Sequence, residues 1–446
     1  MERTLALETR ERVGQEVKLK GWVNRRRDHG KIIFLDLRDR SGLLQLVITS
    51  PLSQSPEVAE IKSEYVVEVT GTVVARSEKA VNPDLSTGTV EVKVSEIKIL
   101  AKSEALPFDM GTAELNLELP KLLDHRALTL RHPKVKSIFK VQEVIIDTFR
   151  QALKEKGFTE FQAPAIVPVA TEGGAEIFPI QYYDKKAYLG QSPQLYKQMM
   201  VGIFERVFTV AKAYRAEPSV TTRHISEYIT LDCEFGFIES LDDIMNTAQD
   251  VLMSIFKVVK ESASEELKMF KASTPEVSVP FPRLKMREAQ QIIFERTGRD
   301  NRNQPDLEPE DEKEICRYTK EKFGSELVFI THYPTKKRPF YTYPDPEDPE
   351  YTLSFDLLGR GLEWITGGRR INDYDQLIAN IHKWGNREED FELYLQAFKY
   401  GMPPEGGFAL GAERITMQIL GLGNIREASL FPRDMERIDF RLSKAQ

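Results

Sequence analysis

Two arginines in unusual settings, Arg215 and Arg414, are the residues of this sequence with the clearest chemistry. Arg215 begins the run RAEPSVTTRH, and Arg414 ends the run GGFALGAER. A guanidinium is permanently charged and presents a planar fork of donors, which suits a pair of phosphate oxygens or a carboxylate. Together the two arginines predict a clamp for a triphosphate, whereas either run alone is equally consistent with a surface arginine beside an ordinary turn.

The elements around these arginines would position them. Arg215 lies between two alternating apolar runs, residues 207–213 and 227–237, which predict a strand, a loop and a second strand. The glycine-rich run before Arg414 continues into a helical pattern from Ile415 to Leu422. Its glycines would let the backbone approach a flat ligand, and the N–H groups of the helix would point at an anion.

Composition is typical of a globular protein of two or three domains, with 446 residues, 41% hydrophobic and 29% charged. No stretch approaches the ~20 apolar residues that span a bilayer, and the N-terminus has no apolar signal core, so we expect a cytoplasmic protein without a membrane partner. Cys233 and Cys316 lack CxxC or histidine partners at ligand spacing, which indicates buried or idle thiols.

Charge is distributed unevenly along the chain. Residues 1–102 hold 17 Lys+Arg against 15 Asp+Glu, whereas the remainder holds 45 against 54. The basic excess is concentrated between Lys18 and Arg40, where it forms a patch large enough for a polyanion. Solvated strand edges also use lysine and arginine, so charge alone leaves nucleic-acid binding open.

The first hundred residues contain strand-like runs at 17–23, 32–38, 43–49, 65–75 and 90–100, separated by turn-rich segments. Such a set of strands predicts a five-stranded Greek-key barrel of the oligonucleotide-binding (OB) kind over residues 1–102. Phe34 and Gln45 lie on the sheet face that these barrels use, where an aromatic ring stacks on a base and an amide reads a base edge. The alternation by itself favours a core position for Phe34.

The rest of the chain predicts an α+β domain over residues 134–446, an antiparallel sheet flanked by helices, with a small inserted helical region around 283–325. A proline-containing linker or hinge is expected at 103–133. A helical pattern follows from Val135 to Leu153, and alternating runs recur at 327–333 and 355–365. The acidic run 308–314 is interpreted as a solvated helix face. Neither GxGxxG nor GxxxxGK[ST] occurs, so the two commonest nucleotide-binding loops are absent.

Four further runs have mutually consistent chemistry: TEGGAE at 171–176, QSPQLYK at 191–197, FDLLGRGLE at 355–363 and TGGRR at 366–370. A glutamate beside a glycine turn could receive an ammonium, and the lysine of the second run lies near two amides. The acids of the third run could hold Mg²⁺ against phosphate oxygens. Each run alone is weak, because acids and lysines are mostly solvated.

Taken together and in this order, the runs resemble the class II aminoacyl-tRNA synthetases, and most closely the aspartyl-tRNA synthetases of archaeal and eukaryotic architecture, which lack the large bacterial insertion domain. The helix from Val135 and the strand that ends at Pro164 are similar to the first class motif, which forms the dimer interface. Residues 214–237 are similar to the second motif and 406–422 to the third. The barrel resembles the anticodon-binding domain, and its runs RRRDHGKIIF and ARSEKAVNPDLSTG look like the bacterial version.

The resemblance implies roles for individual residues. It implies that Arg215, Arg414 and Glu363 are catalytic. It implies an ATP site made of Arg215, Glu217, Arg223, His224, Ile225, Glu363, Gly411, Ala412, Glu413 and Arg414. It implies an aspartate site made of Glu172, Gln194, Lys197, Arg215, Thr366 and Arg370, and a Mg²⁺ site at Glu363 and Thr366. It implies anticodon contacts by Arg26, Arg27, His29, Phe34, Gln45, Arg76 and Glu91.

The resemblance also implies the reaction and its partners. ATP and Mg²⁺ would activate L-aspartate for transfer to tRNA-Asp, the enzyme would be a homodimer, and Asn24 and His29 lie where relatives differ in accepting tRNA-Asn as well. Asparaginyl-tRNA synthetase is the nearest alternative, and Lys197 and the FPRD sequence at 431–434 argue against it. A non-catalytic tRNA-binding paralogue is disfavoured by the intact Arg215, Glu363 and Arg414, and an activating paralogue that charges no tRNA is disfavoured by the barrel.

Four positions depart from the family pattern: Thr366 replaces a usual serine, Arg369 a glutamine, Glu405 a histidine and Ala409 a glycine. These departures concern the tuning of the amino-acid site more than the reaction. We interpret the extra cation at Arg369 and the extra acid at Glu405 as a pair that offset one another across the pocket.

Overall fold

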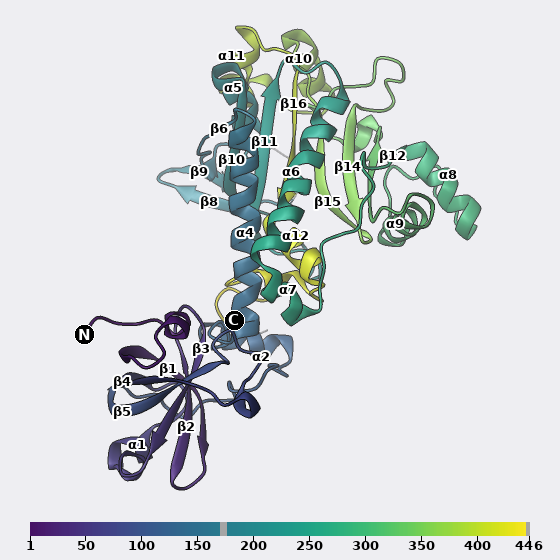
Figure 1. Ribbon diagram of the computed structural model, residues 1–446. Coiled ribbons are helices and arrows are strands. Elements are labelled where there is room, and N and C mark those ends of the chain that lie inside the picture. The colour runs from purple at the N-terminus through teal and green to yellow at the C-terminus, as the bar shows by residue number, and fades with distance from the viewer. Residues whose placement is uncertain (170–175, 443–446) are drawn as a thin grey trace. The chain divides into compact units, whose positions relative to one another are not determined.

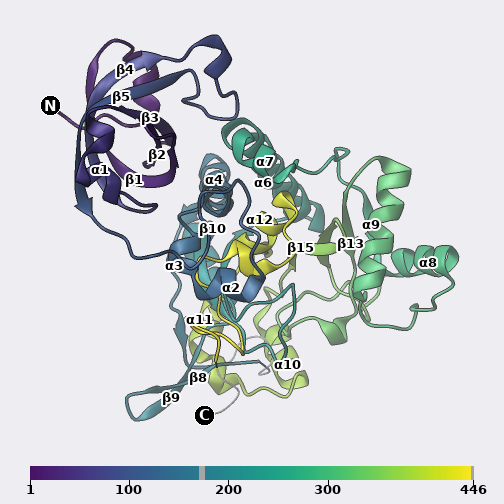
Figure 2. The same cartoon turned by 90° about the horizontal axis from the view of Figure 1, so that it is seen from below.

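The computed structural model describes residues 1–169 and 176–442, and the chain folds into two compact units, Met1–Glu118 and Leu119–Gln446 (Figure 1). The first unit is a closed five-stranded barrel with the strand order β1-β2-β3-β5-β4 (Figure 2). Its strands are β1 Glu16–Asp28, β2 Ile32–Arg38, β3 Leu43–Thr49, β4 Val66–Ala75 and β5 Val90–Ala101, with the short helix α1 Pro56–Glu60. The predicted OB-fold barrel is confirmed.

Period-two alternation builds this barrel. On β2, Ile33, Leu35 and Leu37 are buried in the barrel core, while Phe34 and Asp36 between them point outward. Strand β1 continues to Asp28, beyond its expected end at residue 23. A shift in register between Val23 and Arg25 lets the polar end of β1 keep pairing with β2.

The second unit is built on a mostly antiparallel eight-stranded sheet with the order β12-β13-β14-β15-β16-β11-β10-β6. Within this sheet, as far as the structure describes it, only the outer pairs β12–β13 and β10–β6 are parallel. The strands are β6 Thr159–Glu160, β10 Arg206–Tyr214, β11 Glu227–Gly236, β12 Arg283–Lys285, β13 Leu327–Thr331, β14 Ser354–Gly359, β15 Leu362–Arg369 and β16 Glu405–Gly411. A small separate sheet contains β7 Ile166–Val167, β8 Pro179–Tyr182 and β9 Lys185–Leu189. The predicted α+β class is confirmed.

Amphipathic helices cover this sheet. Helix α4 buries Ile138, Val141, Ile145 and Phe149, which are spaced by three or four residues and so share one face. Helices α4 Pro133–Glu155 and α6 Leu241–Ser262 lie side by side (Figure 1). The other helices are α2 Leu119–Asp124, α3 Arg126–Thr129, α5 Gln194–Phe204, α7 Ser264–Phe270, α8 Met286–Thr297, α9 Pro309–Phe323, α10 Tyr374–Lys383, α11 Glu392–Lys399 and α12 Ala412–Leu420.

One expectation about strands is wrong. The run 355–365 is not one strand but the hairpin β14–β15, because Arg360 and Gly361 adopt positive φ angles of 51° and 78° and make a tight turn. The glycine-rich run before Arg414 is the strand β16. A Cβ on Gly407 would clash with the Cys233 carbonyl oxygen and with Glu234 Oε2, so this glycine lets β16 approach β11 closely.

The segment expected as a linker, 103–133, contains α2 and α3, and from Leu119 it belongs to the second unit. Arg126 fastens it there, because its guanidinium donates to the carbonyls of Glu427 at 2.9 Å, Ser429 at 2.7 Å and Leu430 at 2.8 Å.

The acidic run 308–314 lies at the start of α9, and its interpretation as a solvated face holds for Glu308 and Glu310 but is wrong for Asp311 and Glu314. Asp311 is only 3% exposed and accepts a hydrogen bond from Asn301, and Glu314 is 6% exposed and accepts one from Arg296. These acids are buried because α9 packs against the rest of the insertion.

None of the helices within 1–169 and 176–442 has the length and apolarity needed to cross a membrane.

Candidate active site

The predicted phosphate clamp converges at one end of neighbouring strands. Arg215 follows β10, Glu363 lies on β15, and Arg414 stands in the first turn of α12. Arg414 Nη1 donates to the Glu363 backbone carbonyl and to its Oε1, both at 3.1 Å. Burial lowers the pKa of His224, Glu217 opposes this shift, and the charges of Arg414, Arg215 and Arg223 reinforce it. These side chains therefore share one electrostatic environment, although the chain brings them from widely separated segments.

A pair of acids lies beside this clamp. Burial and the neighbouring Asp356 raise the pKa of Glu363, against the opposing charges of Arg414, Arg338 and Arg215. Arg338 donates to Asp356 Oδ2 at 2.8 Å and to Thr366 Oγ1 at 3.2 Å, and its guanidinium stacks on Tyr333. Sequence reasoning missed Arg338, which lies in a basic and aromatic run without a distinctive spacing.

These oxygens fit a Mg²⁺ ion that also binds a ligand. Asp356 Oδ1 is buried without a hydrogen-bond partner, and carboxylate and hydroxyl oxygens are the donors that Mg²⁺ prefers. Among the described residues, no group of three or more acidic, histidine or cysteine side chains forms a site by itself. A Mg²⁺ ion held by Glu363 and Thr366 would therefore complete its shell with phosphate oxygens and water.

The insertion reaches the clamp through Glu312 of α9. Arg223 Nη1 lies 3.0 Å from Glu312 Oε2, and Nη2 donates to the carbonyl of Gly361 at 3.3 Å. Burial raises the pKa of Glu312 to about 7, with Arg223 opposing and Glu363 reinforcing the shift. The sequence did not single out Glu312, because an acid in an acidic run is usually solvated.

Replacing Glu312 by glutamine should stabilise the protein more at alkaline than at acidic pH. A carboxyl with a pKa of about 7 in the folded state keeps a proton that the unfolded chain releases above about pH 4.3. Unfolding therefore releases this proton between the two values, and the stability of the wild type falls as pH rises through that range.

Urea unfolding at about pH 5 and about pH 8 measures this effect, and the advantage of Glu312→Gln should grow by about 2 kcal/mol between them. Glu310→Gln is the matched control, because Glu310 lies on the same helix but is exposed and pairs with Lys313. An advantage that is equal at the two pH values would contradict the raised pKa.

The residues around the third motif mainly support the site. Gly411 caps α12 and Ala412 is buried. The Glu413 carboxylate accepts from the Ile229 N–H at 3.1 and 3.0 Å, and burial raises its pKa to about 7. The Ile225 side chain is 3% exposed and belongs to the main core. A contact of Glu413 or Ile225 with ATP would therefore have to be made by the main chain.

A buried ionic cluster holds the two cations expected to bind aspartate. Lys197 of α5 is 1% exposed, and its Nζ lies 3.0 Å from both Asp232 Oδ1 and Glu234 Oε2 on β11. Arg370, which follows β15, donates through Nε to Glu234 Oε1 at 2.7 Å. Two acids balance two cations, so a carboxylate ligand would meet cations that are already held in fixed positions.

Sequence reasoning missed the two acids, although the run TLDCEFG on β11 contained a signal. Asp232 and Glu234 are two residues apart on an otherwise apolar strand, so they share one face. Acids on a central strand are almost never buried unless they are paired.

Other residues expected in the aspartate site are placed as follows. Gln194 is buried and donates to Gln198 at 3.1 Å. Glu172 lies outside the described residues. The two extra charges do not form the offsetting pair that we expected: the Arg369 guanidinium stacks 4.2 Å from the Tyr343 ring, and Glu405 accepts a hydrogen bond from Gln198.

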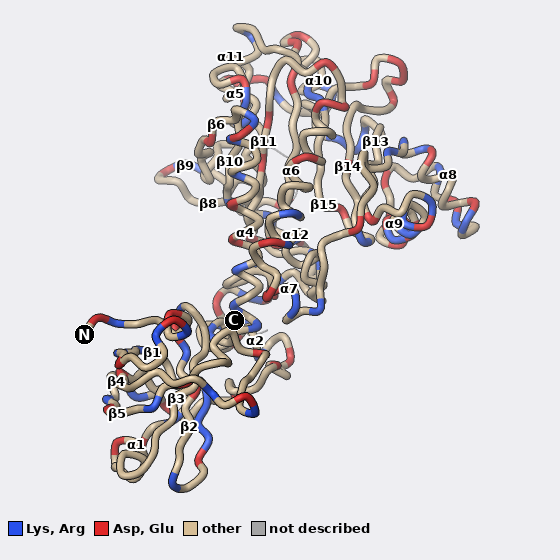
Figure 3. The backbone as a smooth tube through the Cα atoms, viewed as in Figure 1, with Lys and Arg blue, Asp and Glu red and all other residues tan. Residues whose placement is uncertain are grey.

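On the barrel, most of the predicted anticodon residues form one connected surface cluster. Arg27 donates to Gln45 Oε1 at 3.1 Å, Gln45 donates to Glu91 at 2.8 Å, and Arg76 Nε lies 3.7 Å from the same Glu91 oxygen. The half-buried Phe34 ring is 5.9 Å from the Arg27 guanidinium and meets His29 edge-on at 5.7 Å. Basic residues follow the β1–β2 hairpin around this cluster (Figure 3).

Arg26 and Asn24 lie apart from this cluster. Arg26 Nη1 donates to the carbonyls of Val58 at 2.8 Å, Ala59 at 3.1 Å and Ile61 at 2.9 Å, so it caps the C-terminal end of α1. Asn24 is 7% exposed and accepts from Arg38 at 2.9 Å. His29, in contrast, is exposed.

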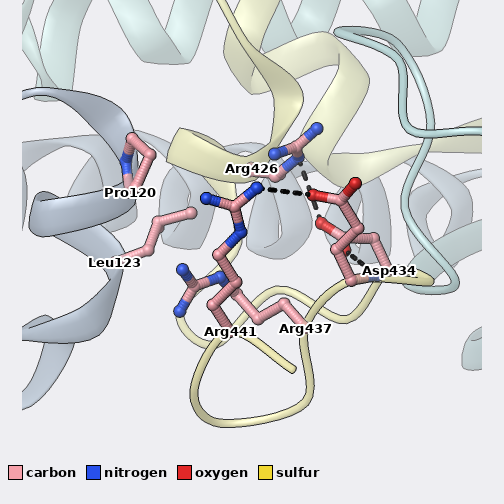
Figure 4. Close-up of a pocket in the computed structure, with 7 residues that line it drawn as sticks. Pro120, Leu123, Arg426, Asp434, Arg437 and Arg441 are labelled. Atoms are coloured by element: carbon pink, nitrogen blue, oxygen red, sulfur yellow. Dashed lines mark hydrogen bonds and ion pairs between the residues drawn. The ribbon is translucent and has the colours of Figure 1, made fainter. Parts of the chain in front are cut away.

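A separate small cavity of about 90 Å³ lies near the C-terminal segment and contains none of the predicted site residues (Figure 4). Its arginines are engaged within the protein, because Arg426 pairs with Asp434 at 3.3 Å and Arg437 with Asp124 at 2.7 Å. This cavity lies where α2 packs against the C-terminal segment.

The sheet is mostly antiparallel, and it receives one arginine from a strand-loop-strand element and another from the helix after a central strand. This is the architecture of the class II aminoacyl-tRNA synthetases. The chain belongs to that class: the profile described as "tRNA synthetases class II (D, K and N)" matches residues 119–435. A profile described as "OB-fold nucleic acid binding domain" matches residues 17–100.

Within the class, the chain belongs to the aspartate–tRNA ligase family. It is 42% identical to the "Aspartate--tRNA(Asp/Asn) ligase" of Deinococcus radiodurans, covering 98% of this chain and 99% of the relative. It is 39% identical to the "Aspartate--tRNA(Asp) ligase" of Pyrococcus abyssi, with coverage of 96% and 97%. Among solved structures, asparaginyl-tRNA synthetase from Pyrococcus horikoshii with asparaginyl-adenylate aligns with a TM-score of 0.89 at 32% identity, covering 98% of this chain and 99% of that one.

Proposed function

We propose that this aminoacyl-tRNA synthetase activates L-aspartate with ATP and transfers it to both tRNA-Asp and tRNA-Asn. The observation that carries the choice of amino acid is the buried pair of cations, Lys197 and Arg370. A side-chain amide would leave such cations poorly matched, and a site built on specific polar pairing rejects the wrong group by roughly 10⁴-fold. The asparaginyl enzyme is 32% identical to this chain, whereas the relatives named as aspartate ligases are 42% and 39% identical to it.

In the proposed activation step, the substrate's α-carboxylate attacks the α-phosphate of ATP and pyrophosphate leaves. Arg215 holds the α-phosphate and the carboxylate, and Arg414 holds the γ-phosphate from the other side. Glu217, Arg223 and His224 surround the adenine and the terminal phosphates, and Glu172 receives the substrate ammonium. Glu363 and Thr366 would hold Mg²⁺, which would neutralise negative charge on the phosphates.

In the transfer step, the 3'-terminal hydroxyl of tRNA attacks the aspartyl-adenylate and AMP leaves. Both steps need orientation and fixed positive charge, and neither needs a covalent bond to the enzyme. Parallel measurement of ATP–pyrophosphate exchange with aspartate and with asparagine tests the amino-acid assignment. Exchange that is equal or faster with asparagine would overturn it.

Acceptance of tRNA-Asn is proposed from His29 and from the relatives. His29 is exposed beside Phe34 on the proposed anticodon surface, and the Deinococcus relative carries both tRNAs in its name. Charging purified tRNA-Asp and tRNA-Asn in parallel should give aspartylation of both. A rate on tRNA-Asn at the background of uncharged controls would restrict the enzyme to tRNA-Asp.

Replacing Phe34 by alanine should weaken tRNA binding about tenfold and leave ATP–pyrophosphate exchange unchanged. The ring projects from the barrel, and the stacking of one base on an aromatic side chain contributes about 1–3 kcal/mol. Filter binding of tRNA-Asp measures the effect. Phe323→Ala, which removes an exposed ring from α9, is the control, and equal affinities of the two variants would exclude Phe34 from the tRNA surface.

We also propose a cytoplasmic homodimer, because translation supplies tRNA there and the first motif of the class forms a dimer interface. Exposed apolar side chains near the end of α5 favour an interface at that end of the unit: Ile203 is 64% exposed, Phe204 48% and Phe237 69%. Gly202 and Gly236 bring these segments close to Met402 and Pro403. Sedimentation of the intact protein should give the mass of two chains, and a monomer at micromolar concentration would contradict this proposal.

A further inference from the structure

Glu405, the first residue of β16, is a buried acid next to the proposed aspartate pocket. Its side chain is 0% exposed, and its backbone carbonyl accepts from the Arg370 N–H at 2.9 Å. An ionised carboxylate at such a position is costly unless a cation pairs with it.

The partner of one Glu405 oxygen is a neutral amide. Gln198 Nε2 donates to Glu405 Oε1 at 2.7 Å. The orientation of that amide is determined by its own oxygen, which accepts from Gln194 Nε2 at 3.1 Å and from the Tyr394 hydroxyl at 3.2 Å. Gln198 therefore directs its N–H group at Glu405 and supplies no charge.

The other Glu405 oxygen faces a second carboxyl, that of Glu234. Glu405 Oε2 is buried without a hydrogen-bond partner, whereas Glu234 Oε2 is served by Lys197 Nζ at 3.0 Å. Glu405 pairs with Gly236 across the β11–β16 ladder and Gly407 pairs with Glu234, so the Glu405 and Glu234 side chains are diagonal neighbours on the same face of adjoining strands. A single proton on Glu405 supplies the missing donor, because a protonated carboxyl gains one O–H group.

We propose that Glu405 is a positioning residue of the aspartate pocket that acts as a neutral carboxylic acid, donating its O–H to Glu234 and thereby holding Arg370 in place for the substrate carboxylate. This inference rests on the proposed function and deepens it. Asp232 and Glu234 already balance Lys197 and Arg370, so an ionised Glu405 would add a third anion and repel aspartate.

The surrounding charges agree with a neutral Glu405. Burial and Glu234 raise its pKa well above the usual range of a carboxyl, while Gln198 and Arg370 oppose the shift. The titratable and charged groups that face the cluster are Asp232 and Glu234 from β11, Lys197 from α5, Arg370 after β15 and Tyr394 from α11. Arg370 is engaged with Glu234 through its Nε, so it does not serve Glu405 as a dedicated counter-ion.

Glutamine and methionine at position 405 separate this role from a structural one. Glu405→Gln keeps a donor for Glu234 and an acceptor for Gln198, so its KM for aspartate in ATP–pyrophosphate exchange should stay within about twofold of wild type, with kcat unchanged. Glu405→Met keeps the volume and loses both hydrogen bonds, so its KM should rise about tenfold or more. If Glu405→Gln is impaired as much as Glu405→Met, a neutral acid is not what the pocket uses and the inference is overturned.

A second measurement uses the wild-type protein itself. Calorimetric titration with L-aspartate in buffers of different ionisation enthalpy counts the protons taken up on binding. Near pH 7 the wild type and Glu405→Gln should take up the same number of protons on binding aspartate, because a Glu405 that is already protonated has no proton to gain. Proton uptake by the wild type that is absent in Glu405→Gln would show that Glu405 is ionised in the free enzyme and would overturn the inference. An absence of any exchange with aspartate in the wild type would instead refute the proposed function.

Discussion

Replacing Lys197 by methionine should lower kcat/KM for aspartate in ATP–pyrophosphate exchange by about 10²- to 10³-fold. The ammonium is 1% exposed and lies 3.0 Å from both Asp232 and Glu234, so its removal leaves two buried anions facing the site of a third. Breaking a buried ion pair also destabilises a protein by about 3–5 kcal/mol. Urea unfolding of the same samples measures this loss of stability separately from the loss of activity.

A double variant distinguishes substrate binding from folding. Adding Asp232→Asn to Lys197→Met removes one uncompensated anion, so it should recover much of the lost stability but little of the activity. Lys212→Met is the matched control. Lys212 pairs with Glu227 at 3.2 Å on the exposed part of the β10–β11 hairpin, whose strand β11 carries Asp232 and Glu234, and surface pairs contribute about 0–1 kcal/mol. Recovery of near wild-type exchange by the double variant would assign Lys197 a purely structural role.

Replacing Arg414 by lysine should reduce kcat of the exchange reaction about 10²- to 10³-fold while KM for aspartate changes little. One guanidinium nitrogen, Arg414 Nη1, donates to both the carbonyl and the carboxylate of Glu363, which fixes the charge beside the proposed phosphates. A lysine keeps the charge, but its single nitrogen cannot hold Glu363 and also present further N–H donors in a fixed plane to a phosphate. The expected effect is on the chemical step because the proposed contact is with ATP and not with the amino acid.

The control for this variant is Arg317→Lys on α9, where the arginine is largely exposed and pairs with Glu314 at 2.8 Å. It should leave kcat and KM unchanged. A variant of Arg414 with normal kcat and a raised KM for aspartate would move this arginine from the phosphate clamp to the amino-acid pocket.

The sequence by itself was sufficient for the class of fold and for the chemistry of the main cations. Strand alternation at residues 32–38 and 43–49 coincides with β2 and β3, because one buried and one solvated face impose a period of two. Arg215 and Arg414 were identified by residue type and by the strand, loop and helix patterns beside them. Both kinds of signal are local, so a single segment contains them.

Only the tertiary structure decided which side chains these cations meet. Arg338 joins Asp356 to Thr366. Glu312 of α9 reaches Arg223, and Glu405 meets Gln198 and Glu234, from segments much farther apart in the chain. Whether an acid is solvated, paired or protonated depends on the burial and the charges that other elements impose, and these are fixed when the sheet and its helices assemble. The sequence pattern around Glu312 and Glu405 contains no measure of that environment.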